Sequence, residues 1–422
     1  MTFAVSFFAL AWPAVAQAQE GEMEMEVPAP GALNAAQGPI AGSTRFMGLG
    51  GAFVAIAEGS EGVALNPASD AVRLPYSWRR FDYGLGADFS IGAWLPKNDF
   101  YNQPDDGNVD QSTAIFGSLH ANVYYDHLGF GLAAQAQSNA ASRPDKRQGF
   151  TTSLGANFGV VHASVAYGFA DGQVLVGAGS RIIGMSFDSA SSSDALSSAG
   201  TGLETGIILK PRADQFRIGV AYKQAIDATL PAAEGAPDTL HVPWEVAVGF
   251  AYQFGKRPLN PPFLAAETLA KRRLPPGQKP TKQQLERAED ELFERYQRLS
   301  RRYLLVSTEL KLVERPTDAG LQGYWEPSGA RMTASDPLLS PRLGLESEVI
   351  ERHLRLRAGS YYEPAIAEGA RGRLHATGGF DVRLFRWNIF GLLDRFDYWQ
   401  LSIAGDGARE YLNTAFSIGF WH

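Results

Sequence analysis

Cysteine is absent from the 422 residues. This absence excludes a disulfide scaffold, a thiolate zinc site, an iron–sulfur cluster and a cysteine nucleophile. Positive charge is not in excess either, because the formal net charge is −7, which argues against nucleic acid as a partner. The one continuous apolar run, residues 3–16, is too short for a comfortable transmembrane helix. Hydrophobic residues nevertheless make up 45% of the chain, so it is not disordered throughout.

The N-terminal run has the form of an export signal. Residues 3–16 are apolar, and Ala16-Gln17-Ala18 is a small-x-small cleavage sequence. No positive residue precedes the run, which departs from the usual signal, and a buried N-terminal helix is the alternative. We expect residues 1–18 to be a signal peptide. Residues 19–38, acidic and then rich in proline, glycine and alanine, are expected to be a flexible leader.

Bulky apolar residues alternate with small or polar residues over long stretches. In residues 244–254, Trp, Val, Val, Phe, Tyr and Phe share one face, and Glu, Ala, Gly, Ala and Gln share the other. A strand shows this period of two when its faces meet different environments. Packed soluble sheets usually place polar residues outside, whereas a transmembrane barrel turns bulky residues to lipid and small or polar ones to its lumen. The pattern predicts an all-β transmembrane barrel.

Fourteen antiparallel strands are expected in this barrel, which would occupy residues 77–422. They are predicted at residues 78–95, 112–125, 127–138, 149–170, 173–187, 200–211, 214–225, 242–254, 302–314, 340–350, 353–364, 372–386, 395–405 and 411–421. An even count suits a bacterial outer-membrane barrel with short periplasmic turns. The fourth strand changes phase near Gly159, which we interpret as a bulge or kink; two shorter strands would make the count odd.

One long connection, residues 255–301, interrupts the barrel on the predicted periplasmic side. Its first half is rich in proline, and its second half predicts a helix that begins with a capping box at Thr281 and Gln284. An apolar stripe follows at helical spacing, formed by Leu285, Leu292, Tyr296 and Leu299. Either the stripe covers the mouth of the barrel, or it docks a periplasmic or outer-membrane protein partner.

The segment ahead of the first strand, residues 39–76, is expected to fold into the lumen as a hatch. Its glycines at 48, 50 and 51 are not followed by Lys-Ser/Thr and lack the context of a dinucleotide fingerprint. Pro67 disfavours helix at Asn66, so Asn66 is expected to open a turn or cap a short helix. A polar, glycine-rich segment of this kind predicts a plug.

These residues resemble a known hatch. Residues 45–55 read Arg-Phe-Met-Gly-Leu-Gly-Gly-Ala-Phe-Val-Ala, and Asn66-Pro67-Ala68 follows about ten residues later. The pattern is similar to the N-terminal hatch of FadL-type outer-membrane transporters of hydrophobic compounds, including the PorV-like branch. The resemblance implies fourteen strands, a luminal hatch and uptake of long-chain fatty acids or other hydrophobic molecules. It implicates Gly48, Gly50, Gly51, Phe53, Asn66, Pro67 and Ala68 in the hatch or in ligand contact. The insertion at 255–301 departs from the family pattern.

No catalytic residue, metal site or cofactor is predicted, and an enzyme is not expected. None of the seven histidines has a metal-ligating spacing, and no nucleophile motif accompanies them. Charges of both signs fall on predicted luminal faces, where internal ion pairs would account for them. Alternatively, Arg355, Arg357 and Arg383 could together grip a ligand carboxylate.

Two functions remain from the sequence. The first is passive uptake of a hydrophobic small molecule by a barrel in contact with outer-membrane lipid, with release by hatch movement or through a wall gap at the kink of the fourth strand. The second is a non-transporting structural or adaptor barrel that holds a periplasmic or secretion-machinery partner through residues 255–301.

Overall fold

The computed structural model describes residues 32–35, 38–73, 77–92, 98–102, 111–144, 151–188, 196–229, 239–314, 319–320, 337–366, 370–386 and 398–421. The predicted signal peptide, residues 1–18, and most of the predicted leader lie outside the described residues. No helix in the described part of the chain is both long and apolar enough to cross a membrane.

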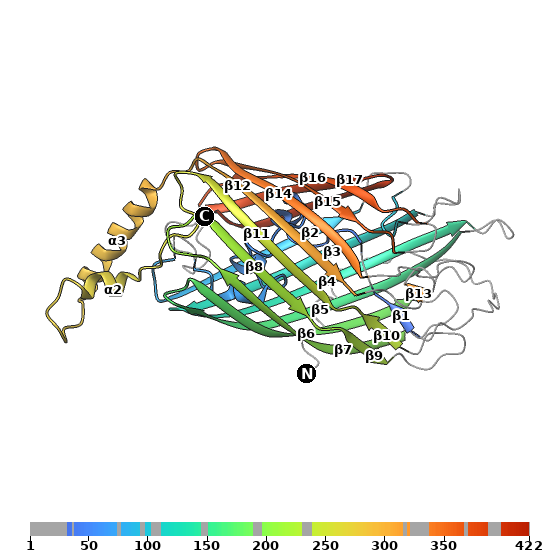
Figure 1. Ribbon diagram of the computed structural model, residues 1–422, viewed down its shortest axis with the longest axis horizontal. Coiled ribbons are helices and arrows are strands. Elements are labelled where there is room, and N and C mark those ends of the chain that lie inside the picture. The colour runs from blue at the N-terminus through green and yellow to red at the C-terminus, as the bar shows by residue number, and fades with distance from the viewer. Residues whose placement is uncertain are drawn as a thin grey trace.

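Fourteen antiparallel strands close into a single barrel (Figure 1). They are β2 (Phe81–Ile91), β3 (Gln111–Tyr125), β4 (Leu128–Pro144), β5 (Thr151–Phe169), β6 (Val174–Asp188), β7 (Leu196–Leu209), β8 (Phe216–Lys223), β11 (Glu245–Gly255), β12 (Tyr303–Val313), β14 (Leu338–Ile350), β15 (Leu354–Glu363), β16 (Arg373–Arg383), β17 (Tyr398–Ala408) and β18 (Tyr411–Trp421). Each predicted strand corresponds to one of these, so the predicted all-β barrel of fourteen strands is confirmed.

The barrel wall is apolar outside and charged inside. Leu203 is 62% exposed while its neighbour Glu204 is fully buried, and Leu374 is 69% exposed beside the fully buried His375. A soluble protein would have the reverse arrangement. An outward apolar surface on a closed antiparallel barrel suits lipid, and an even strand number is the architecture of bacterial outer-membrane proteins. The chain is therefore a transmembrane barrel of the bacterial outer membrane.

The predicted kink in the fourth strand is wrong. The ladder between β4 and β5 runs without a register shift from Pro144↔Thr151 to Leu128↔Tyr167. Phe158 is buried on the luminal face, while Val165 is 42% exposed on the outer face. The apparent change of phase near Gly159 thus arises from a bulky residue that points into the lumen, and the strand wall is continuous there.

The two ends of the barrel differ in their connections. Short turns at 126–127, 170–173, 210–215 and 351–353 lie at the end that also carries the helices, on the left of Figure 1. We name this the turn end and assign it to the periplasm, since periplasmic turns are short. We name the opposite end the loop end. The alternation of short turns at the turn end with longer connections at the loop end fails after β16. There the strand ends joined by residues 384–397 lie at the turn end, and a two-residue turn, 409–410, joins β17 to β18 at the loop end.

Residues 38–73, named here the luminal segment, run inside the barrel from the loop end to the turn end. They contain α1 (Thr44–Gly48) and the 3-10 helices η2 (Ser60–Gly62) and η3 (Pro67–Ala71). Ahead of them, β1 (Ala32–Asn34) pairs in parallel with β10 (Thr239–Val242) and β13 (Ala319–Gly320), while β9 (Ile226–Thr229) completes this small sheet at the loop end. The structure thus departs from the predicted flexible leader at Ala32–Asn34.

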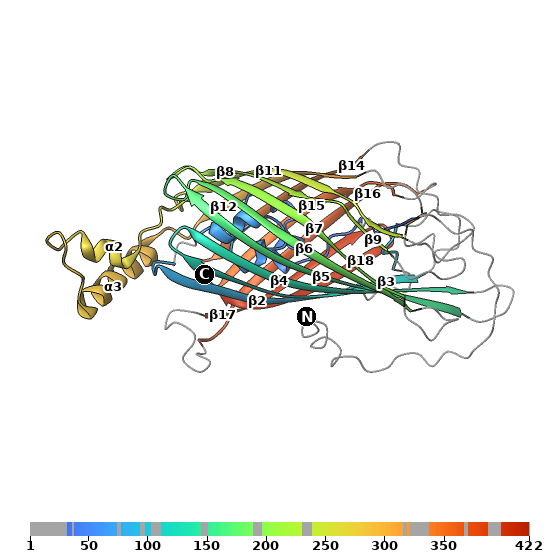
Figure 2. The ribbon, with the colours of Figure 1, turned by 90° about the horizontal axis from the view of Figure 1, so that it is seen from below.

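The 255–301 connection projects from the turn end as a helical arm (Figures 1 and 2). It carries α2 (Ala266–Lys271) and α3 (Lys282–Arg298). The predicted capping box is present: the Thr281 hydroxyl accepts from the backbone N–H of Gln284, whose side chain accepts from the backbone N–H of Thr281. The sequence predicts this helix over residues 281–302; it is confirmed, although it ends at Arg298.

Candidate transport path

The glycine turn of the luminal segment lies directly against the barrel wall. Gly50 and Gly51 have φ angles of 58° and 73°, which glycine adopts without a steric penalty. A Cβ atom on Gly50 would lie 2.7 Å from the backbone nitrogen of Ser360 in β15. The turn therefore needs glycine both for its backbone conformation and for its approach to the wall. Gly48 closes α1 just before it, close to Arg357.

Phe53 is an anchor of the luminal segment. Its side chain is fully buried and makes an edge-to-face contact with Phe46, with ring centroids 6.2 Å apart. The backbone N–H groups of Phe53 and Val54 both donate to one carboxylate oxygen of Glu309 in β12, at 3.0 and 2.8 Å. Hydrogen bonds to a buried carboxylate are stronger than neutral ones, so this contact fixes the segment to the wall.

Asn66 caps η3, as the sequence predicts. Its Oδ1 accepts from the backbone N–H of Ala68 at 3.0 Å, and its Nδ2 donates to the carbonyl oxygens of Val54 and Val220 at 3.1 and 3.4 Å. Pro67 follows as the first residue of η3. A Cβ atom on Gly206 of β7 would lie 1.9 Å from Asn66 Oδ1, so the wall accommodates this cap because it carries glycine there.

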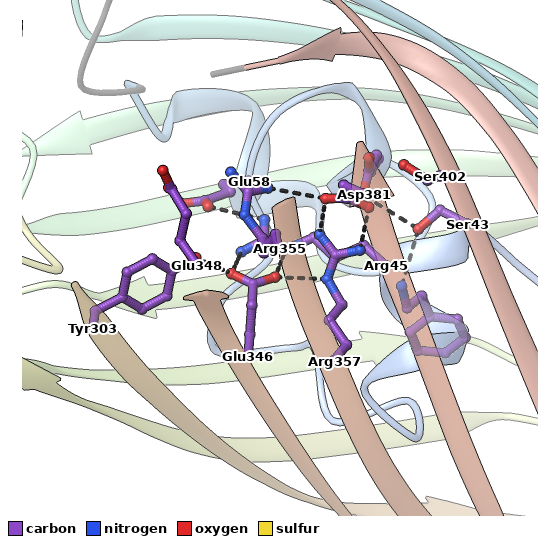
Figure 3. A network of polar contacts seen from close by, with 12 residues as sticks. Ser43, Arg45, Glu58, Tyr303, Glu346, Glu348, Arg355, Arg357, Asp381 and Ser402 are labelled. Atoms are coloured by element: carbon purple, nitrogen blue, oxygen red, sulfur yellow. Dashed lines mark hydrogen bonds and ion pairs between the residues drawn. The ribbon is translucent and has the colours of Figure 1, made fainter. Parts of the chain in front are cut away.

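Buried ion pairs join the luminal segment to the wall (Figure 3). Arg45 of α1 bonds Glu346 of β14 at 2.9 Å and Glu58 at 3.0 Å, and Glu58 bonds Arg217 of β8 at 2.8 Å. Glu346 also bonds Arg357 at 2.7 Å. Removing one partner would strand a buried charge, which typically costs about 3–5 kcal/mol. The segment is therefore held by a connected network.

Two carboxyl groups of the luminal segment have pKa values shifted in opposite directions. Burial disfavours the charge of Glu58, but Arg217 and Arg45 outweigh it and lower its pKa to about 2. Burial raises the pKa of Asp70 to about 7, against the hydrogen bond that it accepts from Ser164 Oγ at 2.5 Å. The other oxygen of Asp70 has no hydrogen-bond partner among the described residues. Glu58 is thus a fixed anion, whereas Asp70 titrates near neutrality.

The three arginines predicted to grip a carboxylate line one cavity but have different partners. Arg355 lies 3.2 Å from Asp381, and Arg357 bonds both Asp381 and Glu346 (Figure 3). Arg383 instead meets Nε2 of His353 at 2.9 Å. A ligand carboxylate would have to displace Asp381 from Arg355 and Arg357. Internal ion pairs, the alternative left open by the sequence, describe these two residues.

Arg45, Glu58 and Glu346 were not recognised as functional residues from the sequence. Glu346 could have been assigned to the lumen, because Leu343 and Leu345 place their side chains on the outer face of the same strand. No sequence signal joins it to Arg45, which precedes it by 301 positions. Their contact depends on where the luminal segment stops within the barrel.

The luminal segment separates two cavities. The outer chamber, about 230 Å³, lies toward the loop end and is lined by Phe46 and Phe53 of the segment and by Phe116 and Phe158 of the wall. The second, about 500 Å³, lies toward the turn end and is lined by residues 58–61 of the segment. We name this second cavity the vestibule. Residues of the segment thus line both cavities.

The wall is incompletely paired where the barrel closes. β2 pairs with β3 over its full length, from Phe81 to Ile91, but with β18 over five residue pairs, from Ile91↔Thr414 to Ala87↔Ile418. The vestibule is lined by residues from both faces of the remaining part of β2 and by Gly419. It therefore extends through the wall toward the lipid at this place, which we name the seam.

The apolar stripe of α3 packs against the chain itself. Leu292, Leu285 and Tyr296 join a cluster with Leu269 of α2 and Trp78, which precedes β2. Leu299 is half-buried at the end of the helix, outside that cluster. Ion pairs from Arg79 to Glu289 at 3.4 Å and from Arg80 to Glu267 at 2.9 Å also hold the arm. Most of the stripe thus packs within the chain, and a partner at these residues would have to compete with the contacts to Trp78 and Leu269.

Comparisons with known proteins give structural neighbours alone. No protein-family model and no curated protein matches the sequence. Among solved structures, a deltaS2S3 mutant of the TodX monoaromatic hydrocarbon channel is 14% identical (86% of this chain, 94% of that chain, TM-score 0.49). The CymD monoaromatic hydrocarbon channel is 15% identical (90% and 96%, TM-score 0.46). CdiB from Acinetobacter baumannii is 7% identical (81% and 60%, TM-score 0.38).

Proposed function

We propose that this barrel mediates the passive uptake of hydrophobic molecules across the outer membrane, with the luminal segment as its hatch. The observation that carries the proposal is the position of the segment between the outer chamber and the vestibule. The aromatic lining of the outer chamber suits an apolar ligand. Lys311 in the same chamber is paired with Glu245 at 2.8 Å, but Lys223 favours a ligand with a carboxylate, so long-chain fatty acids are the substrates that we propose.

The seam supplies the exit in this proposal. A hydrophobic molecule that has passed the hatch would enter the vestibule and then leave between β2 and β18, where pairing stops at Ala87↔Ile418. This route replaces the exit at the fourth strand, whose ladder is continuous. Leaving sideways keeps an apolar molecule out of the aqueous periplasm, which lowers the free-energy cost of release.

Locking the hatch tests the proposal. Ser60 of the luminal segment and Gly84 of β2 are placed so that a Cβ atom on Gly84 would lie 3.8 Å from that of Ser60, the mean separation in disulfides. Because the chain has no native cysteine, the Ser60→Cys/Gly84→Cys variant would form one defined crosslink. We expect oxidised cells to lose uptake of labelled oleate and to regain it after reduction.

The single variants Ser60→Cys and Gly84→Cys are the matched controls, and both should transport under oxidising conditions. Full uptake by a barrel whose crosslink has been verified by gel mobility would contradict a moving hatch. Full uptake by an uncrosslinked sample would say nothing about the hatch, so the crosslinked fraction must be measured in the same sample as transport.

A structural or adaptor role is the second candidate, because the arm projects beyond the barrel (Figure 2) with an exposed charged face. Deleting residues 258–300 separates the two functions. Under the uptake proposal, oleate transport survives the deletion. Loss of a co-purifying protein on deletion, from a barrel that transports no oleate in either form, would instead support the adaptor role.

A further inference from the structure

The vestibule is far more basic than the rest of the chain. Ten arginines line it, against four carboxylates, although the chain as a whole has a net charge of −7. The carboxylates Glu348 and Asp381 pair with the lining residues Arg257 and Arg355, at 3.4 and 3.2 Å, and still leave positive charge in surplus. Figure 3 shows Glu348, Asp381 and Arg355. Arginine keeps its charge at any physiological pH, so this cavity is a permanent site of positive potential.

Glu348 shows how the surplus arises on one side of the vestibule. Its side chain is fully buried, and its Oε2 lies 3.4 Å from Nη1 of Arg257 and 3.7 Å from Nη1 of Arg301. Its other oxygen accepts from the backbone N–H of Arg352. The side chain of Arg301 is 7% exposed, and its Nε has no hydrogen-bond partner among the described residues. The single carboxylate of Glu348 thus pairs with the guanidinium groups of Arg257 and Arg301. Arg352, whose backbone N–H binds the same carboxylate, also lines the vestibule.

Arg383 and Arg386 add two further cations to the lining of the vestibule. Both guanidinium groups stack on the ring of Tyr398, at 4.3 and 4.4 Å from its centroid. Within the described residues neither forms an ion pair with a carboxylate, and Nη2 of Arg383 lies 2.9 Å from Nε2 of His353. Stacking leaves the in-plane N–H groups of a guanidinium able to bind a bidentate anion.

Beside these cations the vestibule becomes apolar and open to lipid. It is lined by Phe81, Tyr83 and Leu85, which are 58%, 39% and 51% exposed on the outer face of β2. Across the seam, a Cβ atom on Gly419 would have no neighbour within 4 Å. An acyl chain could therefore run from the vestibule through the seam while its head group stays among the arginines.

We propose that the vestibule is a binding site for an anionic amphiphile, whose phosphate or carboxylate is held by Arg383, Arg386 and the arginines around Glu348 and whose tail leaves through the seam. The site requires no transport, so it goes beyond the uptake function and would stand if the hatch never opened. A phospholipid of the periplasmic leaflet and a transported fatty acid share this chemistry.

Binding to the full-length barrel in neutral detergent tests the site, with native mass spectrometry as the measurement. The probes are oleic acid, dioleoyl-phosphatidylglycerol and uncharged oleyl alcohol. We expect both anions to bind at least about tenfold more tightly than the alcohol, and the Arg383→Gln/Arg386→Gln variant to weaken the anions about tenfold without affecting the alcohol. Tighter phosphatidylglycerol identifies a leaflet lipid as the occupant, and tighter oleate a transported molecule; either result supports the site.

The matched control is Arg298→Gln/Arg302→Gln, which removes the same charge from side chains that are 81% and 87% exposed and should change nothing. If the vestibule variant does not fold, salt replaces it: raising ionic strength should weaken the anions in the unaltered barrel and spare the alcohol. Equal binding of oleate and oleyl alcohol would overturn the proposal, as would anion binding that ignores both the substitutions and salt.

Discussion

At the scale of single residues, the sequence predicted positions but not pairings. The glycines at 50 and 51 and the cap at Asn66 follow from local backbone rules, and the structure uses them in that way. Arg45 and Glu346 could not be paired in advance, because their contact requires the register of the luminal segment against β14. Turns and helix caps depend on neighbouring residues and can be predicted locally, whereas an ion pair in the lumen depends on the fold of the whole barrel.

Asp70 gives a prediction at this scale. Its pKa in the folded barrel is about 7, above the ordinary value of 3.8. Between these values the folded protein binds more protons than the unfolded chain, so the free energy of unfolding falls as the pH rises from about 4 to about 7. Above pH 7 the buried oxygens carry a charge with one hydrogen bond, from Ser164, and the luminal segment should be easier to release.

The measurement is protease cleavage of the luminal segment between pH 5 and pH 8. Cleavage of the unaltered barrel should accelerate through pH 7, while Asp70→Asn, which keeps the shape without the charge, should flatten that rise. Identical pH profiles for the two proteins would remove Asp70 as the cause. Glu58 cannot account for this pH dependence, because its pKa of about 2 lies below the range of the measurement.

At the scale of elements, period-two alternation located all fourteen strands, because lipid and lumen impose opposite demands on consecutive residues. It failed where the lumen accepts a large side chain, as at Phe158 of β5. The helix of the arm was also predictable, through its capping box and stripe. The packing of that stripe on Trp78 was not, because Trp78 lies more than two hundred positions away in the chain.

Trp78 gives the prediction for the arm. Its ring contacts Phe293 and Tyr296 of α3, with centroids 6.1 and 6.5 Å apart. Trp78→Ala would remove the centre of this cluster, a change that costs about 3–5 kcal/mol in a well-packed core. We expect trypsin to cleave the arm at least tenfold faster in the variant while the barrel keeps its heat-resistant mobility on gels. An outward aromatic substitution, Tyr167→Ala, is the control, and equal cleavage of all three proteins would show that Trp78 does not hold the arm.

At the scale of the whole molecule, the structure places the luminal segment beside the outer chamber and the basic vestibule, and the seam in the wall of the vestibule. The barrel itself followed from the sequence, since strand number and sidedness are set by alternation and loop length. The cavities did not, because each is the space left between the luminal segment and a wall built from distant strands. The charge of the cavities could not be predicted either, because a net charge of −7 for the chain does not indicate a cationic vestibule.

The course of the luminal segment has a topological consequence. β1 lies in the sheet at the loop end, and β2 begins at the turn end, so the closed wall encircles a thread of its own polypeptide. During biogenesis, either the segment is in place before the first and last strands meet, or its N-terminal side has to pass through the closed barrel from the turn end. In both cases the pairing of β2 with β18 completes the ring around the segment. Its five residue pairs make it the shortest ladder in the described wall.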